Sequence, residues 1–216
     1  MRLVHGKAVF SDPGELLAAD HTAIAVIDMQ NDFCSPGGHF DKAGKDLADI
    51  QDMIPRLLRF LDEARRRGLP VFHVQQTTLP GGAADSAAWL YLKTRRGGDP
   101  DYTVDGTWGH DFVPGCEPLP GEPVVRKHRS SGFVNTTLPT LLGARGSATL
   151  VCTGVTTQGC VESTARDAVF FDFHAAVARD CVASTRRDLH EASLLVQSVR
   201  HEILSSDEIL ALWDAA

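Results

Sequence analysis

The order strand, helix, strand in the first third of the chain constrains its fold more than any other feature. The run Ala23–Asp28 is apolar up to its last residue, which is typical of a strand buried on both faces. Between Asp46 and Arg67 apolar residues recur along one helical face, and Gly68 ends the pattern. A second strand then begins at Pro70. Because two strands joined by a helix pair in parallel through a right-handed crossover, the chain predicts a parallel sheet.

The same alternation returns in the second half of the chain. Strands are predicted at 123–127, 148–153 and 175–178, and helices near 138–144, 158–171 and 189–201 and after Ser206. This order predicts an α/β fold of three layers, α/β/α, in which helices cover both faces of a mostly parallel sheet. The 216 residues, 43% of them hydrophobic, suit one domain over residues 1–216.

Residues 76–121 interrupt the alternation. The stretch is rich in Gly, Pro and Asp, and it holds Trp89, Trp108 and both tyrosines of the chain. Long irregular stretches between regular elements usually form lids or binding loops. We therefore expect a long binding loop over about 76–121.

The charge balance bears on the partners. With 21 Lys and Arg against 28 Asp and Glu, the formal charge of -7 disfavours nucleic acid or an anionic membrane surface. No stretch reaches the roughly 20 apolar residues that span a bilayer, and the N-terminal segment lacks an apolar signal core. We expect a cytoplasmic enzyme with a small-molecule substrate and neither a nucleic acid nor a membrane partner.

The cysteines bear on redox compartment and metal binding. They are odd in number and lack CxxC spacing, and they stand at Cys34, Cys116, Cys152, Cys160 and Cys181. Such a set predicts free thiols in a reducing compartment, with neither a disulfide framework nor a zinc site.

Polar residues lie at or just after the carboxyl ends of three predicted strands. Asp28 ends the first strand, Lys127 ends the strand at 123–127, and the segment Gly154–Cys160 follows the strand at 148–153. In open α/β sheets, ligands bind in the crevice outside the carboxyl ends of the strands. We therefore expect a carboxylate, an ammonium and a thiol to meet in one crevice.

Cys160 falls in the first turn of a predicted helix, where the helix dipole lowers the pKa of a thiol and favours the nucleophilic thiolate. Asp28 then exchanges protons, and Lys127 stabilises both negative groups. Each residue also has a simpler interpretation. Cys160 is then a small core residue, Asp28 a cap or turn residue, and Lys127 a solvated strand end.

Three stretches resemble the signature segments of the isochorismatase-like cysteine hydrolases and occur in the same order: Val26–Phe33, Lys127–Phe133 and Thr153–Ala165. The resemblance runs from about His21 to Glu208. It implies a Rossmann-like, six-stranded parallel sheet and catalytic roles for Asp28, Lys127 and Cys160. It also implies a cis peptide between Val155 and Thr156, an oxyanion site made by the N–H groups of Thr156 and Cys160, and a homo-oligomer, either dimer or tetramer.

Within this family the residues favour some members over others. Isochorismatases that cleave a vinyl ether typically lack the cysteine, so Cys160 disfavours that reaction. Nicotinamidases resemble one another in an Asp-x-His metal site after the second strand, whereas here a lone His73 predicts a packed or hydrogen-bonded side chain, and we expect no metal or other cofactor.

The segments 106–113, 125–135 and 161–164 are most similar to the amidohydrolases of ureidoacrylate, biuret and N-carbamoylsarcosine. The segment Thr156–Gly159 departs from that branch and leaves the exact substrate open.

The expected function is cleavage of a C–N bond in a small amide or carbamoyl (ureide) substrate through a thioester-like intermediate, with release of ammonia or a carbamate. Phe33, Trp108, Arg129 and Gln158 are the candidates for substrate contact. Phe33 and Trp108 are equally interpretable as packing residues, and Arg129 as a partner of surface acids. The alternative of another class, a thiol-bearing scaffold or redox sensor, would need neither Asp28 nor Lys127.

Overall fold

The centre of the molecule is a six-stranded sheet with the strand order β5-β4-β3-β6-β7-β8, in a computed structural model that describes residues 1–215. All neighbouring strands pair in parallel. The strands are β3 (Thr22–Ile27), β4 (Val71–Gln76), β5 (Val124–Lys127), β6 (Thr149–Val155), β7 (His174–Ala183) and β8 (Glu202–Leu204). The sheet that the sequence predicts is therefore present, with its strands parallel.

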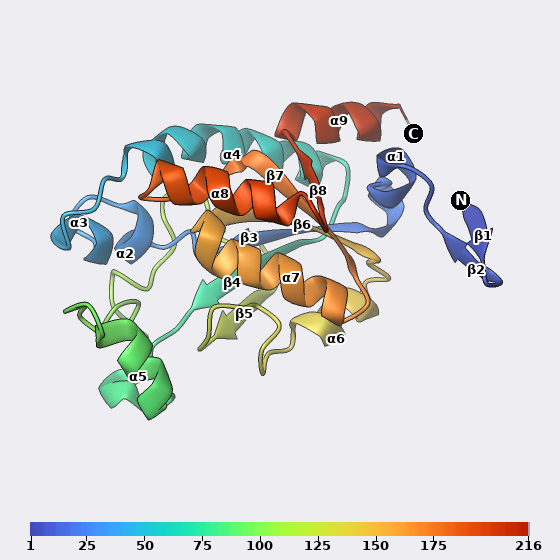
Figure 1. The fold of residues 1–216 in the computed structure, drawn as a ribbon. Coiled ribbons are helices and arrows are strands. Elements are labelled where there is room, and N and C mark those ends of the chain that lie inside the picture. The colour runs from blue at the N-terminus through green and yellow to red at the C-terminus, as the bar shows by residue number, and fades with distance from the viewer. Residues whose placement is uncertain (216) are drawn as a thin grey trace.

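Helices cover both faces of this sheet, which makes three layers (Figure 1). Alternate residues of β3 divide between the faces: Ile24 and Val26 pack in one apolar core, and Ala23, Ala25 and Ile27 in the other. The first core is closed by α4 (Ala48–Arg66) and α9 (Ser206–Asp214), and the second by α6 (Leu138–Ala144) and α7 (Glu162–Phe170). The helix α8 (Arg187–Gln197) packs against the segment between β6 and α7.

Several short elements complete the chain. They are β1 (Arg2–Val4), β2 (Lys7–Val9), α1 (Pro13–Leu16), η1 (Ala19–His21), α2 (Asn31–Cys34), α3 (His39–Lys42), η2 (Pro80–Gly82), α5 (Ala87–Thr94) and η3 (Thr157–Val161). The strands β1 and β2 form a hairpin that stands apart from the sheet (Figure 1). Its turn has positive φ at His5 (49°) and Gly6 (77°), the conformation of a tight two-residue hairpin turn.

The structure differs from the sequence-based expectation mainly in short elements. Sequence periodicity does not indicate β1, β2 or β8, because three residues are too few to show it. The stretch 76–121 is not wholly irregular, since α5 forms there with the Ser86 side chain accepting a hydrogen bond from the Trp89 N–H. The helix expected from about residue 158 begins as a π-helix, η3, before α7 continues it.

The strand order places the crevice of the sheet between β3 and β6. From β3 the chain moves outward to β4 and β5, and it then returns to the other side of β3 to form β6, β7 and β8. Ligands of open α/β sheets bind where the order reverses in this way, outside the carboxyl ends of the strands. In Figure 1 these ends point to the left, toward α2, α3 and α5.

Over the residues described, none of the helices is both long and apolar enough to cross a membrane. All five cysteines are free thiols, as their spacing predicts.

Candidate active site

Asp28 lies directly after β3, at the point where the strand order reverses. Its backbone has φ of 53°, a left-handed conformation that Asp adopts more readily than most residues. Its N–H donates to the Val74 carbonyl at 2.8 Å, and its Oδ1 accepts from the Gln76 N–H at 2.8 Å. The side chain is 1% exposed. The carboxylate is therefore fixed at the carboxyl edge of the sheet and removed from solvent.

Lys127, the last residue of β5, reaches across the end of β4 to this carboxylate. Its Nζ lies 2.8 Å from Asp28 Oδ2, 2.9 Å from Gln76 Oε1, 3.2 Å from the Arg129 carbonyl and 3.3 Å from Cys160 Sγ. The side chain is fully buried. The ammonium thus contacts both the carboxylate and the thiol, and the structure brings together the three residues that the strand-end argument selects.

Cys160 lies on the turn from β6 to α7. The Val155–Thr156 peptide before it is cis, as the family resemblance implies. Gly154 makes the close approach to β3 possible, because it has φ of +98° and a Cβ there would lie 2.1 Å from the Ile27 carbonyl oxygen. After the turn, the Thr164 hydroxyl donates to the Cys160 carbonyl at 2.7 Å. These contacts hold the thiol at the start of the helix.

The pKa of the Cys160 thiol differs from the sequence-based expectation. Burial lowers the pKa of Lys127. Asp28 and Cys160 raise it by more than burial lowers it, so the net shift of that pKa is upward. Burial raises the pKa of Cys160 to about 12, the Asp28 charge adds to the rise, and Lys127 opposes it. The expected lowering of the thiol pKa by the helix start is therefore wrong, because desolvation and the neighbouring carboxylate outweigh it. The resting cysteine is a thiol that needs a base.

The candidate substrate contacts fall into two groups. Phe33 is 7% exposed, and its ring packs 5.0 Å from that of Phe40 and 5.7 Å from that of Tyr102. Trp108 is 52% exposed, and its carbonyl accepts from Asn31 Nδ2 at 2.9 Å. The contacts of Phe33 are those of a packing residue, and about half of Trp108 is exposed to solvent.

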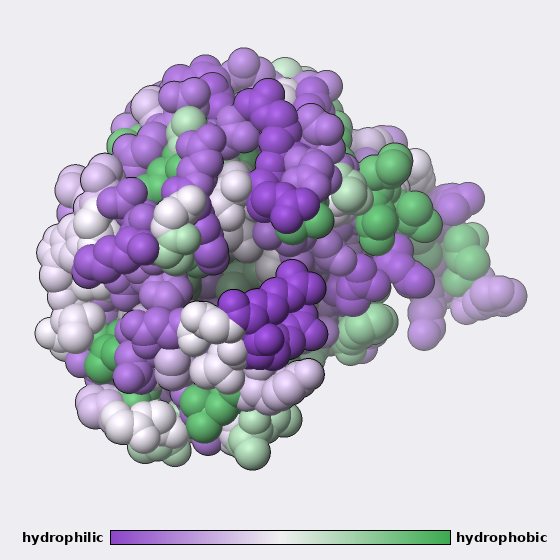
Figure 2. Space-filling view, turned by 60° about the vertical axis from the view of Figure 1, so that its left-hand side comes forward, coloured by the Kyte–Doolittle hydropathy of each residue, from purple (hydrophilic) through white to green (hydrophobic). Residues whose placement is uncertain are grey.

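Arg129 and Gln158, by contrast, line one open cavity of about 470 Å³, together with Trp89. The Arg129 guanidinium lies 5.2 Å from the Trp89 ring centre, and its Nη1 donates to the carbonyls of Ala84 and His128 at 3.1 and 2.6 Å. Arg129 therefore bonds backbone oxygens where a surface ion pair was the alternative. Figure 2, in which the left side of Figure 1 comes forward, shows a hollow near the middle of a mostly hydrophilic face.

His73 is packed and hydrogen-bonded, as predicted for a lone histidine in a strand. It is fully buried in β4, its Nε2 lies 2.8 Å from Glu122 Oε2, and its ring packs 5.5 Å from that of Phe112. Within residues 1–215, no three or more His, Cys, Asp or Glu side chains are grouped in a way that could hold a metal ion.

Three residues of the site were not found by sequence reasoning. Gln76 contacts both Asp28 and Lys127, and Gln30 contacts Gln76. Tyr102 lies close enough that, after burial, the charges of Cys160 and Asp28 raise its pKa. Gln76 is the last residue of β4, so the strand-end argument that selects Asp28 also applies to it. Tyr102 comes from the long loop, and no local pattern indicates where it lies.

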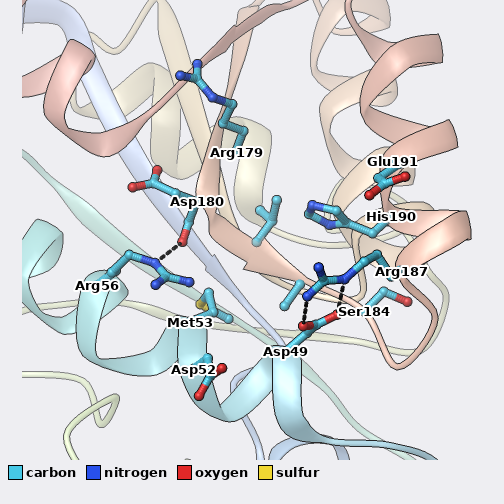
Figure 3. A pocket seen from close by; sticks show the side chains of 12 residues that line it. Asp49, Asp52, Met53, Arg56, Arg179, Asp180, Ser184, Arg187, His190 and Glu191 are labelled. Carbon is cyan, nitrogen blue, oxygen red and sulfur yellow. Dashed lines mark hydrogen bonds and ion pairs between the residues drawn. The ribbon is translucent and has the colours of Figure 1, made fainter.

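A second pocket, of about 300 Å³, lies between α4, β7 and α8 (Figure 3). Arg187 pairs with Asp49 there at 2.5 Å, and Arg56 donates to the Asp180 backbone carbonyl at 3.2 Å. His190 lines this pocket and bonds the Thr157 hydroxyl at 2.8 Å. The pocket therefore adjoins the turn that carries Cys160, but it does not include Asp28, Lys127 or Cys160.

Comparison with known proteins agrees with this geometry. Residues 22–204 match the isochorismatase domain family. The chain is 37% identical over 203 residues to the ureidoacrylate amidohydrolase RutB of Methylobacterium radiotolerans, which covers 88% of this chain and 79% of the relative. It is 34% identical over 185 residues to RutB of Yersinia enterocolitica, with 81% and 80% covered.

Among solved structures, an isochorismatase-like hydrolase from Alkaliphilus metalliredigens is similar with a TM-score of 0.72 and 31% identity, over 89% of this chain and 98% of that one. The family match covers most of the chain, and the sheet and the three signature segments agree with it. This protein therefore belongs to the isochorismatase family of hydrolases.

Proposed function

We propose that this chain is a cysteine-dependent amidohydrolase that cleaves a C–N bond of a small ureide or related carbamoyl compound, of the kind named for its RutB relatives. The observation that carries the proposal is the position of Lys127 Nζ, 2.8 Å from Asp28 Oδ2 and 3.3 Å from Cys160 Sγ. A nucleophile, a base and a cation in direct contact are the parts that covalent amide hydrolysis needs. A redox sensor would need only the thiol.

The first half of the proposed reaction acylates the thiol. Asp28 takes the proton of Cys160 as Sγ adds to the substrate carbonyl carbon, and the N–H groups of Thr156 and Cys160 stabilise the oxyanion. The C–N bond then breaks, and the departing amine leaves with the proton that Asp28 held. Because burial and Asp28 keep the pKa of Cys160 at about 12, the thiol is protonated at rest and proton transfer must accompany attack.

The second half releases the acyl group. Water adds to the thioester-like carbonyl as Asp28 takes one of its protons, and the same N–H groups hold the oxyanion. The C–S bond then breaks, and the thiolate recovers its proton from Asp28. Lys127 keeps its charge throughout and stabilises the carboxylate and the sulfur when either is negative.

A cavity of about 470 Å³ lies next to the segments that carry Lys127 and Cys160, although neither of those side chains lines it. Arg129 and Gln158 line it, and within the described chain the Gln158 Oε1 is buried without a hydrogen-bond partner. We propose that these two side chains contact the part of the substrate that does not react. Both residues are among the candidates for substrate contact that the sequence suggests.

The test is a Cys160→Ala variant assayed for ammonia release from ureidoacrylate-type ureides, biuret, N-carbamoyl amino acids and nicotinamide. We expect the wild-type enzyme to prefer a ureide and the variant to lose turnover by about 10⁴-fold or more, because the nucleophile is gone. Cys181→Ala is the control, since that thiol is buried on β7, outside the site. Substantial activity in a folded Cys160→Ala variant would contradict the covalent mechanism.

A further inference from the structure

Gln76 is a neutral side chain whose amide oxygen bonds the ammonium at the centre of the site. Its backbone N–H donates to Asp28 Oδ1 at 2.8 Å, and its side-chain Oε1 accepts from Lys127 Nζ at 2.9 Å. It therefore contacts both members of the buried ion pair through two different groups. The side chain is 3% exposed, so these bonds are made away from solvent.

The contacts of Lys127 show why this acceptor matters. An ammonium has three N–H donors, and four acceptors surround this one. The shortest bond is to Asp28 Oδ2 at 2.8 Å, and the longest is to Cys160 Sγ at 3.3 Å. Without a further acceptor on the β4 side, the attraction between opposite charges would draw Nζ toward the carboxylate and away from the sulfur.

Gln76 is itself held in place by Gln30. The Gln30 amide donates to the Gln76 carbonyl at 3.0 Å and accepts from the Gln76 N–H at 3.0 Å, as a neighbouring strand would. Gln30 also donates to the His110 carbonyl at 2.8 Å, which ties the pair to the long loop. Gln30 is fully buried. The end of β4 is therefore a fixed support, because both its backbone groups and its terminal side chain are bonded.

We propose that Gln76 is a positioning residue that holds Lys127 Nζ in contact with both Asp28 and Cys160 and thereby sets the reactivity of the thiol. The inference rests on the proposed role of Cys160. As a neutral acceptor, Gln76 fixes the ammonium without cancelling its charge, so that the charge acts on the sulfur. A carboxylate at this position would compete for the ammonium with Asp28 and Cys160.

The experiment measures alkylation of Cys160 by iodoacetamide, which needs no substrate. The other four cysteines are fully buried in the native protein, so Cys160, which is partly exposed, is the thiol that reacts, and Cys160→Ala gives the blank. Alkylation proceeds through the thiolate, so its rate at a fixed pH follows the thiolate fraction. A packing role for Gln76 would leave this rate unchanged.

We expect Gln76→Met to alkylate about tenfold more slowly than wild type near pH 8. As the ammonium moves away from the sulfur, a rise of about one unit in the pKa of Cys160 lowers the thiolate fraction tenfold. The pH profile of kcat/KM should move upward by a similar amount. Gln75→Met is the matched control: Gln75 is the preceding residue of β4, is also buried, and donates to the His110 carbonyl at 2.9 Å. Its variant should alkylate at the wild-type rate.

A second variant keeps the test valid where Gln76→Met does not fold. Gln76→Glu has almost the same size and keeps an oxygen beside Nζ, but its charge competes for the ammonium, and we expect slower alkylation there as well. Unchanged or faster alkylation in either folded variant, or equal slowing in Gln75→Met, would overturn the inference. Failure of the proposed function looks different, since wild type would then alkylate normally and hydrolyse none of the amides or ureides.

Discussion

The buried Asp28–Lys127 pair allows a quantitative test by a double-mutant cycle. At 2.8 Å between Nζ and Oδ2, Coulomb's law with an effective dielectric constant of about 20 gives an attraction of about 6 kcal/mol. Taking two ions out of water costs several kcal/mol each, so the net stability of the pair is close to that of an uncharged pair of similar size. Removing one partner, by contrast, leaves an uncompensated buried charge.

We therefore expect Asp28→Asn and Lys127→Met each to lower the free energy of unfolding by about 3 to 5 kcal/mol. The double variant should cost far less than the sum, about 0 to 2 kcal/mol, because neither charge remains. Asn is the suitable replacement at residue 28, since φ there is 53° and Asn tolerates this conformation. Met retains much of the length of the Lys127 side chain and no charge.

Urea unfolding followed by circular dichroism measures these differences. A loss of 3 to 5 kcal/mol lowers the midpoint by about 1 to 2 M. The control is Asp207→Asn, which removes a partner of Arg59 at a similar distance, 2.7 Å, but on the surface, where both side chains are more than half exposed. We expect no resolvable change there.

The pH dependence of stability gives an independent test, because it should differ between wild type and Asp28→Asn. In wild type the pKa of Lys127 is raised above its usual 10.5, so its contribution to stability is fully present below that pH and is lost only as pH rises through the higher folded pKa. In Asp28→Asn the opposing burial dominates and lowers that pKa. The difference in free energy of unfolding between Asp28→Asn and wild type should therefore become smaller above about pH 8. Single variants that each cost under about 1 kcal/mol, or a double variant that costs their sum, would refute the reasoning.

Two further predictions concern the frame of the site. Burial raises the pKa of Glu122, but Arg65, the Leu119 N–H and His73 lower it to about 2, below its usual 4.5, so its contribution to stability is present above pH 4.5 and is lost as pH falls to about 2. Glu122→Gln should lower the free energy of unfolding by about 1 to 2 kcal/mol near pH 7, less than full linkage because solvent screens this carboxylate, and by about a quarter of that near pH 2.5. An equal cost at both pH values in urea unfolding would contradict this. Gly154→Ala should lower the free energy of unfolding by about 3 kcal/mol or more, since its Cβ would lie 2.1 Å from the Ile27 carbonyl oxygen. The control Gly143→Ala, on α6 where a Cβ meets no other atom within 4 Å, should be neutral or stabilising. Equal effects of the two substitutions on thermal unfolding would contradict the predicted clash.

Much of the fold could be predicted from the sequence because its main elements are long enough to show a period. The helix α6 has the bounds that its pattern predicts, and β3, β4, β5 and α4 lie within two residues of theirs. The short strand β8 and the N-terminal hairpin could not be found in this way. They form because neighbouring segments supply their hydrogen-bond partners, and that is a property of the tertiary structure.

The expected homo-oligomer and the cytoplasmic location stay predictions. Both depend on surroundings that a single chain does not contain. The substrate likewise stays a proposal that follows the names of relatives, together with the cavity at Arg129 and Gln158.

The sequence by itself determined which residues follow the strands, and hence that Asp28, Lys127 and Cys160 share one edge of a parallel sheet. This is possible because the local pattern marks where each strand ends, and because the alternation of strands and helices makes the strands parallel. Only the tertiary structure decided that Lys127 contacts both of the other two, that Gln76 bonds its ammonium, and that the pKa of the thiol is raised. A pKa depends on burial and on charges from distant segments, and neither is set until the chain has folded.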